Sequence, residues 1–173
     1  PALRCALEGC TAEENTTLSF SDPLKLEGKD LAAGKYGLHM IPSEKEWIII
    51  FSSVNNGWGS YGYNEQEDAL RVTVTPKESP FEERLSFRFD NTSDNAVVVA
   101  LYWEKLAVPF RVEFDVPQIV LGNMRKELHG LPQFYWQPWN QAANYCLHHG
   151  LNYPEALSWV DRSISINENF TNL

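Results

Sequence analysis

The sequence predicts an α+β protein with an antiparallel β-sandwich over residues 1–116 and a helical tail over residues 117–173. Two patterns support this prediction. Apolar and polar residues alternate in several short stretches between residues 15 and 116, with no helical pattern between them, which is typical of a sandwich of the jelly-roll or immunoglobulin-like type. After Pro117 the apolar period changes from 2 to 3.6, which indicates helices.

The first strands are short or paired across a turn. Two short strands are predicted at residues 16–20 and 24–27. Residues 35–41 alternate, whereas residues 47–51 form a continuous apolar run, and the turn 42–45 separates them. This contrast predicts an edge or half-exposed strand next to a buried one.

The later strands follow a loop rich in Gly and Asn at residues 54–64. Residues 70–74 and 84–89 alternate, and a longer alternating run from residue 97 to residue 114 is interrupted at Glu104-Lys105. The inward-facing residues should form one core, because a register slip of one residue would expose the whole set. The expected core residues are Leu70, Val72, Val74, Leu85, Phe87, Phe89, Val108, Phe110 and Val112.

Pro109 lies inside the last alternating run, which predicts an edge strand or a bulge at that point, because proline cannot donate to a ladder.

The tail is predicted to form a helical hairpin. Gly150 is a common C-terminal stop, and residues 152–155 resemble a helix start. Residues 118–131 are expected to form a connecting helix. One helical face contains Trp139, Ala142, Ala143 and Cys146, and a second contains Ala156, Leu157, Val160, Ser163 and Ile164.

Composition and charge exclude several classes of function. The 23 acidic residues outnumber the 14 basic ones, and the net charge of -9 argues against binding to nucleic acid or to an anionic membrane surface. No apolar run approaches the ~20 residues that a membrane span requires. No cofactor motif is present, so no cofactor is expected.

The three cysteines leave the redox compartment open. Cys5 and Cys10 are close enough in sequence to form a disulfide, and Cys146 lies on the inward helical face as a packed thiol. The chain starts at Pro1 with neither an initiator methionine nor a signal peptide, so we expect it to begin inside a longer gene product.

Few residues suggest catalysis or metal binding. The sequence contains no nucleophile elbow, phosphate-binding loop or zinc-protease motif. His39 lies in an alternating strand, where a sheet-face histidine is expected rather than a ligand. His148 and His149 end a helix and diverge by ~100°, which makes a poor chelating pair. The acidic residues 65–68 lack the spacing of a calcium loop, so no metal site is expected.

The Gly-rich loop combines large aromatic residues with a flexible backbone. In one interpretation its aromatic side chains are exposed and stack on sugar rings or anchor a protein partner. In the other, Trp58 plugs the open end of the sandwich and the glycines only shape the turn. The candidate ligand-binding residues are Trp58, Tyr61, Tyr63, Glu65, Glu67 and Asp68.

The β region resembles a bacterial family of uncharacterised proteins, the domain of unknown function 2911. Five blocks occur in the order of the family and together cover roughly residues 10–115. The blocks are residues 14–20, residues 31–42 with Trp47, residues 57–59, residues 67–72, and residues 101–104 with 108–110. The resemblance implies a periplasmic or secreted protein without an established activity, so no catalytic residue is carried over.

The tail resembles one tetratricopeptide helix pair, a unit that needs stacked copies for stability. Its large aromatic residues, Trp136, Trp139, Tyr145 and Trp159, exceed what one hairpin interface can bury. We therefore expect them to contact the β domain, the connecting segment 118–131 or a second copy in a homodimer. The candidate partner-binding residues are Trp136, Trp139 and Trp159.

The sequence favours a non-enzymatic, exported binding or assembly module whose partner is a protein or a carbohydrate. The alternative is a hydrolase that acts on an envelope carbohydrate or a small molecule through the acidic and aromatic loop near residues 57–68. Glycoside hydrolysis would require two carboxylates that face each other at ~5–9.5 Å.

Overall fold

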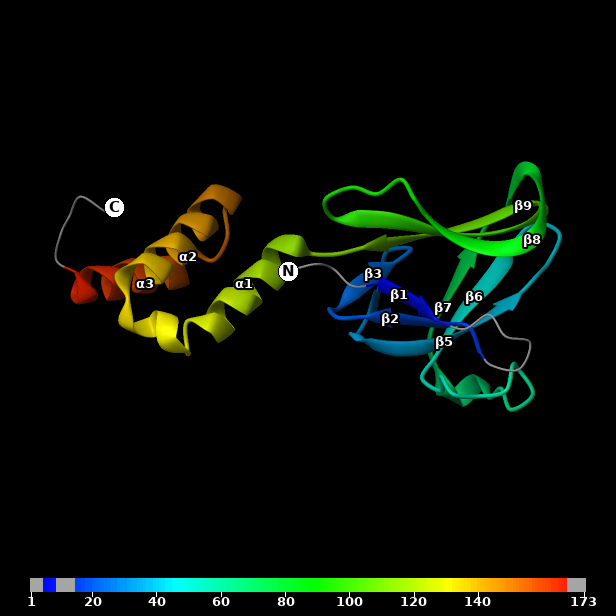
Figure 1. The fold of residues 1–173 in the computed structure, drawn as a ribbon, viewed down its shortest axis with the longest axis horizontal. Helices are drawn as coiled ribbons and strands as arrows, with labels where there is room; N and C mark the ends of the chain where they lie inside the picture. The colour runs from blue at the N-terminus through cyan, green and yellow to red at the C-terminus, as the bar shows by residue number, and fades with distance from the viewer. Residues whose placement is uncertain (1–4, 9–14, 168–173) are drawn as a thin grey trace. The chain divides into compact units, whose positions relative to one another are not determined.

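The computed structural model describes residues 5–8 and 15–167 and contains two compact units, Pro1–Phe114 and Asp115–Leu173 (Figure 1). Two antiparallel sheets make up the first unit, and helices make up the second. This arrangement confirms the predicted α+β class with a sandwich-like β region.

The first sheet has five strands in the order β1-β2-β5-β6-β7, all antiparallel. The strands are β1 (Cys5–Glu8), β2 (Thr17–Phe20), β5 (Gly34–Ile41), β6 (Trp47–Ser52) and β7 (Asp68–Val74). Of the two alternatives for residues 35–41, an edge or a half-exposed strand, the edge is wrong, because β5 lies between β2 and β6.

The second sheet has four strands in the order β4-β3-β9-β8. These are β3 (Leu24–Leu26), β4 (Lys29–Leu31), β8 (Lys77–Asp90) and β9 (Ala96–Glu113). The left-handed residues Glu27 (φ 47) and Gly28 (φ 78) turn the chain between β3 and β4. A glycine suits this tight two-residue turn because it adopts a positive φ without steric cost.

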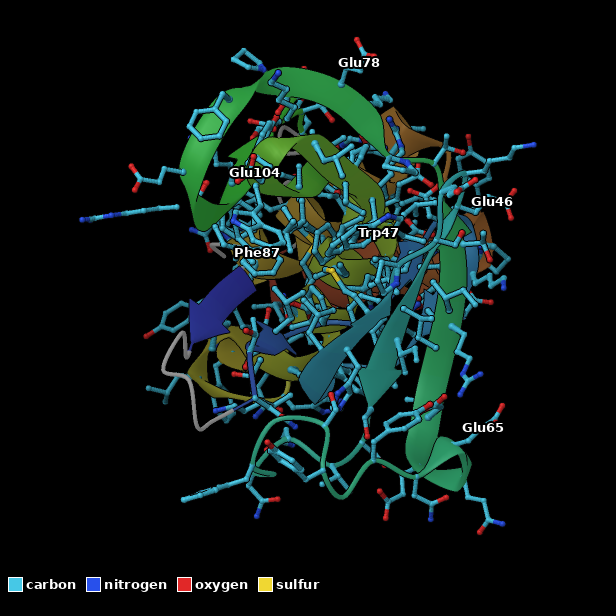
Figure 2. All side chains as sticks on the ribbon, turned by 90° about the vertical axis from the view of Figure 1, so that its right-hand side faces the viewer. Glu46, Trp47, Glu65, Glu78, Phe87 and Glu104 are labelled. Atoms are coloured by element: carbon cyan, nitrogen blue, oxygen red, sulfur yellow. The ribbon has the colours of Figure 1, made fainter. Side chains whose placement is uncertain are left out.

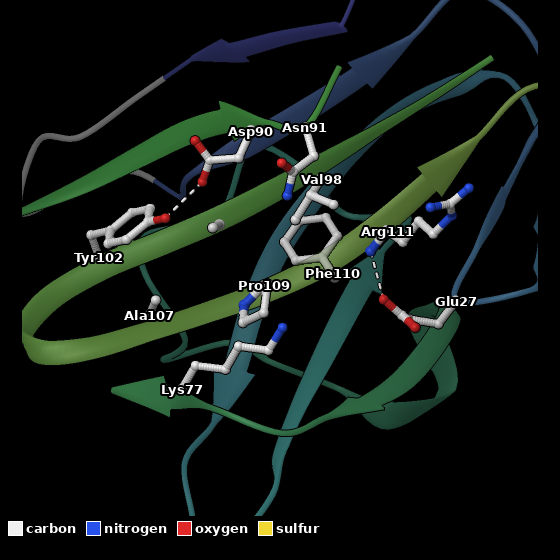
Figure 3. A pocket seen from close by; sticks show the side chains of 11 residues that line it. Glu27, Lys77, Asp90, Asn91, Val98, Tyr102, Ala107, Pro109, Phe110 and Arg111 are labelled. Atoms are coloured by element: carbon white, nitrogen blue, oxygen red, sulfur yellow. Dashed lines mark hydrogen bonds between the residues drawn. The ribbon is translucent and has the colours of Figure 1, made fainter. Parts of the chain in front are cut away.

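Strand β9 folds back on itself. If its 18 residues were fully extended they would span ~60 Å. However, the Phe114 N–H, just after the strand, donates to the Asn95 carbonyl, just before it, at 2.8 Å. The reversal coincides with Glu104, whose φ of 54 is left-handed, at the interruption seen in the sequence pattern. Figure 3 shows the two halves of β9 side by side.

Pro109 lies on β9 between the segments that pair with β8 and with β3. Strand β8 pairs with β9 at Leu106 and Ala107, and β3 pairs with it at Val112 and Glu113. The predicted edge strand is wrong here, because β9 lies between β3 and β8, although the missing N–H of Pro109 falls between the two paired segments.

The sandwich core lies between the two sheets. The rings of Phe51 and Phe110, one from each sheet, meet edge to face with centroids 5.8 Å apart. Of the expected core residues, five are buried, and Leu70 and Phe87 are half-buried. The buried five are Val72, Val74, Val108, Phe110 and Val112.

The core prediction is wrong for two residues of β8. Leu85 and Phe89 are 42% and 46% exposed, although Val99, opposite Phe89 on β9, is fully buried. The two residues have the inward phase, but β8 is the edge strand of its sheet. Edge position therefore leaves them partly in solvent, and alternation alone does not reveal which strand is at the edge.

The helical unit contains α1 (Val116–Glu127), η2 (Leu131–Phe134), α2 (Trp136–His149) and α3 (Tyr153–Ile166). Gly150, with a left-handed φ of 65, ends α2, and the Leu151 N–H returns to the Cys146 carbonyl at 2.9 Å. The Arg125 guanidinium of α1 makes two hydrogen bonds, of 2.8 and 2.6 Å, to the Glu155 carboxylate of α3. This interaction fastens α1 to the hairpin and lowers the pKa of Glu155.

The core of the helical unit combines all three helices. Its buried residues are Leu121, Leu128, Ala142, Ala143, Cys146, Ala156 and Trp159. Cys146 is fully buried, and burial raises the pKa of its thiol, which fits a packed, unreactive side chain. Cys10, and with it any pairing to Cys5, lies outside the described residues. Among the described helices, none combines the length and apolarity needed to cross a membrane.

Candidate functional site

The loop between β6 and β7, residues 53–67, lies on the outer face of β5. A Cβ built on Gly37 of β5 would come within 2.4 Å of the Val54 carbonyl, so the loop backbone rests directly on this glycine. The Asn55 amide donates to the Lys35 carbonyl at 2.9 Å. The Asn15 N–H donates to the Gly57 carbonyl at 3.2 Å, which ties the loop to the approach to β2. These contacts hold the base of the loop against the sheet.

The two ends of the loop are also tied to each other. The Ser53 N–H and hydroxyl both donate to the Glu67 carbonyl, at 2.9 and 2.8 Å. The Asn64 side chain caps the short helix η1 (Glu65–Glu67) by accepting from the Gln66 N–H. Figure 2 shows Glu65 at the opposite end of the sheet from Glu46. The loop therefore closes on itself and has a fixed base.

His39 of β5 lies beneath this loop. Its Nδ1 is 2.9 Å from the Ser60 hydroxyl, and its ring lies 5.1 Å from the Tyr63 ring between centroids. Burial lowers the pKa of His39, and the nearby Asp68 carboxylate partly opposes this by favouring the charged ring. The sheet-face position expected for His39 is correct, but the loop covers this face.

A polar network joins the end of the loop to β7. The Tyr63 hydroxyl donates to Asp68 Oδ2 at 2.8 Å, and Arg71 donates to both Asp68 and the Tyr63 hydroxyl. Arg71 also forms an ion pair with Glu65 at 2.9 Å. The Asp68 side chain is only 8% exposed, and its Oδ1 has no hydrogen-bond partner among the described residues. The network therefore depends on one nearly buried carboxylate.

Two aromatic side chains of the loop point into solvent. Trp58 is 67% exposed and Tyr61 is 97% exposed. The interpretation of Trp58 as a plug in the sandwich is wrong, because a plug would be buried. The loop instead displays two aromatic residues on a base that is hydrogen-bonded to the sheet.

The structure brings together three of the six loop residues singled out in the sequence: Tyr63, Glu65 and Asp68. Trp58 and Tyr61 remain exposed, as described above. Glu67 contributes its main-chain carbonyl to the closure of the loop.

Sequence reasoning missed Ser60 and Arg71 and underestimated His39. The register could have placed two of them: His39 pairs with Ile50, and Ile50 pairs with Arg71, so the three residues form a row across β5, β6 and β7. Ile50 is 1% exposed although it shares this outer row, which shows how completely the loop region covers it. No local pattern marks Ser60, because its position depends on the path of the loop.

The carboxylates of this site have restricted chemistry. Glu65 and Asp68 both bind the Arg71 guanidinium, so a cation lies between them. A glycosidase instead holds two carboxylates on either side of a glycosidic bond, one of them protonated. The site is better suited to holding the loop than to acid–base catalysis.

The candidate partner-binding residues differ in exposure. Trp159 is 6% exposed, and Trp139 packs on the same core while its Nε1 donates to the Gln133 carbonyl at 3.1 Å. Trp136 is half-buried, and its carbonyl accepts from the Ser163 hydroxyl at 3.0 Å. The core that receives Trp139 and Trp159 includes Leu121 of α1, so the connecting segment covers part of their surface.

The helix-terminal histidines have separate interactions. His148 Nδ1 lies 2.8 Å from the Asn144 carbonyl, whereas the His149 ring packs on Tyr145 at 4.3 Å.

Comparison with known proteins identifies the family of the β unit. The family model "Protein of unknown function (DUF2911)" matches residues 9–112. The chain belongs to this family. The match spans the β unit, including β5, the loop 53–67 and β9. No curated protein and no solved structure matches the chain. Membership of DUF2911 thus confirms the resemblance seen in the sequence and assigns no reaction.

Proposed function

We propose that this DUF2911 protein is an exported, non-enzymatic binding module that uses the loop 53–67 to bind a carbohydrate. The exposure of Trp58 and Tyr61 on a hydrogen-bonded base is the observation on which the proposal rests. Aromatic faces stack on the apolar faces of sugar rings, and a rigid base reduces the entropy lost on binding. Ser60 and Glu65, near the aromatic residues in sequence, offer polar groups for sugar hydroxyls.

A glycan array followed by a titration of the best ligand tests this proposal. Trp58→Ala and Tyr61→Ala should each weaken binding at least about fivefold, if stacking on a sugar contributes ~1–3 kcal/mol, as aromatic stacking on a nucleobase does. Trp103→Ala is the matched control, because Trp103 is 49% exposed but lies on β9. The unfolding midpoint should not change in any of the three variants. Equal affinity of Trp58→Ala and Trp103→Ala for the glycan would contradict the proposal. If no glycan binds and a protein binds instead, the ligand is a protein and not a carbohydrate.

The alternative function, a hydrolase acting on an envelope carbohydrate or a small molecule, has weaker support. Its acidic residues would be Glu65 and Asp68, and both are bound to Arg71. Turnover of a chromogenic glycoside that disappears in Glu65→Gln but persists in Trp103→Ala would favour the hydrolase over the binding module.

Export to the periplasm or the medium is part of the proposal and rests on the family resemblance. Fractionation of cells that express the full gene product should place the protein outside the cytoplasm. Recovery in the cytoplasmic fraction together with a cytoplasmic marker enzyme would contradict this part of the proposal and leave carbohydrate binding to be judged separately.

The helices are proposed to dock a protein partner or a second copy of the chain. Leu147 of α2 and Leu157 of α3 are exposed, although both are large apolar residues. Light scattering tests the homodimer by measuring the molar mass of the wild type and of the double variant Leu147→Glu/Leu157→Glu. A dimeric wild type and a monomeric variant are expected, because two charges at an apolar interface would dissociate the dimer. A monomeric wild type would exclude the second copy as the partner.

A further inference from the structure

The outer face of the four-stranded sheet contains a cavity of about 340 Å³ (Figure 3). It lies where β9 folds back, and residues from both halves of that strand line it. Its apolar lining residues are Val98, Ala100, Ala107, Pro109 and Phe110. Ala100, Ala107 and Pro109 have short side chains, and Ala100 and Ala107 are only 1% and 7% exposed in the wall of the cavity.

Most charged groups around the cavity already have partners. Asp90 accepts a hydrogen bond from the Tyr102 hydroxyl at 2.7 Å. Glu27 Oε1 accepts from the Arg111 backbone N–H at 2.5 Å, and Arg111 Nε donates to Glu113 at 2.8 Å. These contacts fix the rim, where Arg111 is ion-paired with Glu113, whereas Asp90 and Glu27 keep their charge because their donors are neutral.

Lys77 is different from these rim residues. No ion pair or hydrogen bond joins its ammonium group to any residue in the described part of the chain. The pairing of β8 with β9 sets Lys77 opposite Ala107, one of the apolar lining residues. Figure 3 shows the Lys77 side chain beside Pro109. A cation without a partner is thus held next to an apolar floor.

We propose that this cavity binds a small carboxylate with a compact apolar body, of the size of an acylated amino acid. The carboxylate would pair with Lys77, and the apolar body would cover Ala100, Ala107 and Pro109. The Asn91 side chain, which also lines the cavity, carries an amide that can donate to and accept from an acyl-amide group of the ligand. The volume is near the lower end of small-molecule sites, ~300–1,000 Å³, which excludes long polymers as fully enclosed ligands. This site is separate from the loop 53–67 and does not depend on the carbohydrate proposal.

The alanines of the cavity provide direct reporters for a test. In protein labelled with ¹³C at the alanine methyls, the probes are N-acetylglycine, N-acetyl-L-alanine and N-acetyl-L-leucine. Saturable shifts are expected at Ala100 and Ala107, whereas Ala69 of β7, in the other sheet and outside the cavity lining, serves as the reference. The neutral analogue N-acetyl-L-leucinamide should bind about fivefold more weakly than N-acetyl-L-leucine, because a solvent-accessible ion pair contributes up to ~1 kcal/mol.

A matched pair of variants separates the role of Lys77 from a general charge effect. Lys77→Gln should weaken N-acetyl-L-leucine binding about fivefold and abolish the preference for the carboxylate over the amide. Lys45→Gln removes an equal charge from the exposed turn after β5 and should change neither. The proposal is overturned if no probe shifts Ala100 and Ala107 saturably, if the amide binds as well as the acid, or if both lysine variants behave alike.

Discussion

The two outer faces of the β-sandwich differ in what lies over them. On the five-stranded sheet, the loop 53–67 rests on Gly37 and covers His39, and its aromatic tips point into solvent. On the four-stranded sheet, short side chains of the folded-back β9 leave a cavity of about 340 Å³ with Lys77 beside it. One face presents a projecting surface and the other an indentation.

This difference shows how side-chain size determines the surface of a sheet. A loop backbone can approach a strand only where the strand has no Cβ in the way, and Gly37 provides that approach. Ala100 and Ala107 have a Cβ but no longer side chain, and longer residues such as Tyr102 surround them. A missing Cβ therefore admits a covering segment, whereas short side chains among longer ones leave a cavity.

The largest expected effect comes from removing Asp68, which connects the loop to β7. Asp68→Ala deletes the acceptor of both Tyr63 and Arg71, and hydrogen bonds to a charged group contribute about 1.5–3 kcal/mol. We expect the free energy of unfolding to fall by about 2–3 kcal/mol, measured by urea denaturation. Glu65→Gln is the control: the Glu65 side chain is 75% exposed, so its loss should cost less than about 1 kcal/mol. Equal losses would mean that the network does not fix the covered face.

Substitution of Gly37 tests the covered face directly. Gly37→Ala sets a methyl group within 2.4 Å of the Val54 carbonyl, so the loop backbone must move. Overpacking of this kind costs about 1–3 kcal/mol, and a displaced loop should also weaken any ligand of Trp58 and Tyr61. Gly62→Ala, in the same loop, meets nothing within 4 Å and should be neutral. If Gly37→Ala is as stable as the wild type, the loop does not rest on β5.

A smaller effect is expected from the protonation of His39. Because burial lowers its pKa in the folded state, the unfolded chain binds the proton more tightly. The stability associated with neutral His39 is present above the unfolded pKa, about 6.5, and decreases as the pH falls from there towards the lowered folded pKa. His39→Gln should remove this part of the pH dependence in denaturation series. An unchanged slope between about pH 5 and 6.5 would show that His39 is not held neutral by the loop.

The sequence predicted the fold class and most strands because each depends on local patterns. The run at residues 47–51 became the buried strand β6, whereas the reversal of β9 at Glu104 was not predicted. The exposure of Leu85 and Phe89 was missed, because alternation specifies the face of a strand but not its place in the sheet. The same limit produced the wrong edge assignment for residues 35–41.

The candidate sites were less predictable than the fold. The acidic and aromatic loop was found from its composition, but the contacts of His39 with Ser60 and of Arg71 with Asp68 depend on strand register and on the loop path. The cavity on the other face gave no sequence signal. It requires Ala100 and Ala107 to become neighbours through the reversal of β9, and nothing in the spacing of alanines predicts that.

The smallest effect is expected at Ala107, on the open face. Ala107→Val adds two methyl groups, twice what Gly37→Ala adds, but they enter the cavity rather than a contact with backbone. Valine also favours strands, so we expect the free energy of unfolding to change by no more than about 0.5 kcal/mol. The same variant should abolish the shift that N-acetyl-L-leucine causes at Ala100, because the added methyls occupy the apolar floor. A loss of stability comparable to that of Gly37→Ala would mean that the space above β9 is not open, and the contrast between the two faces would not hold.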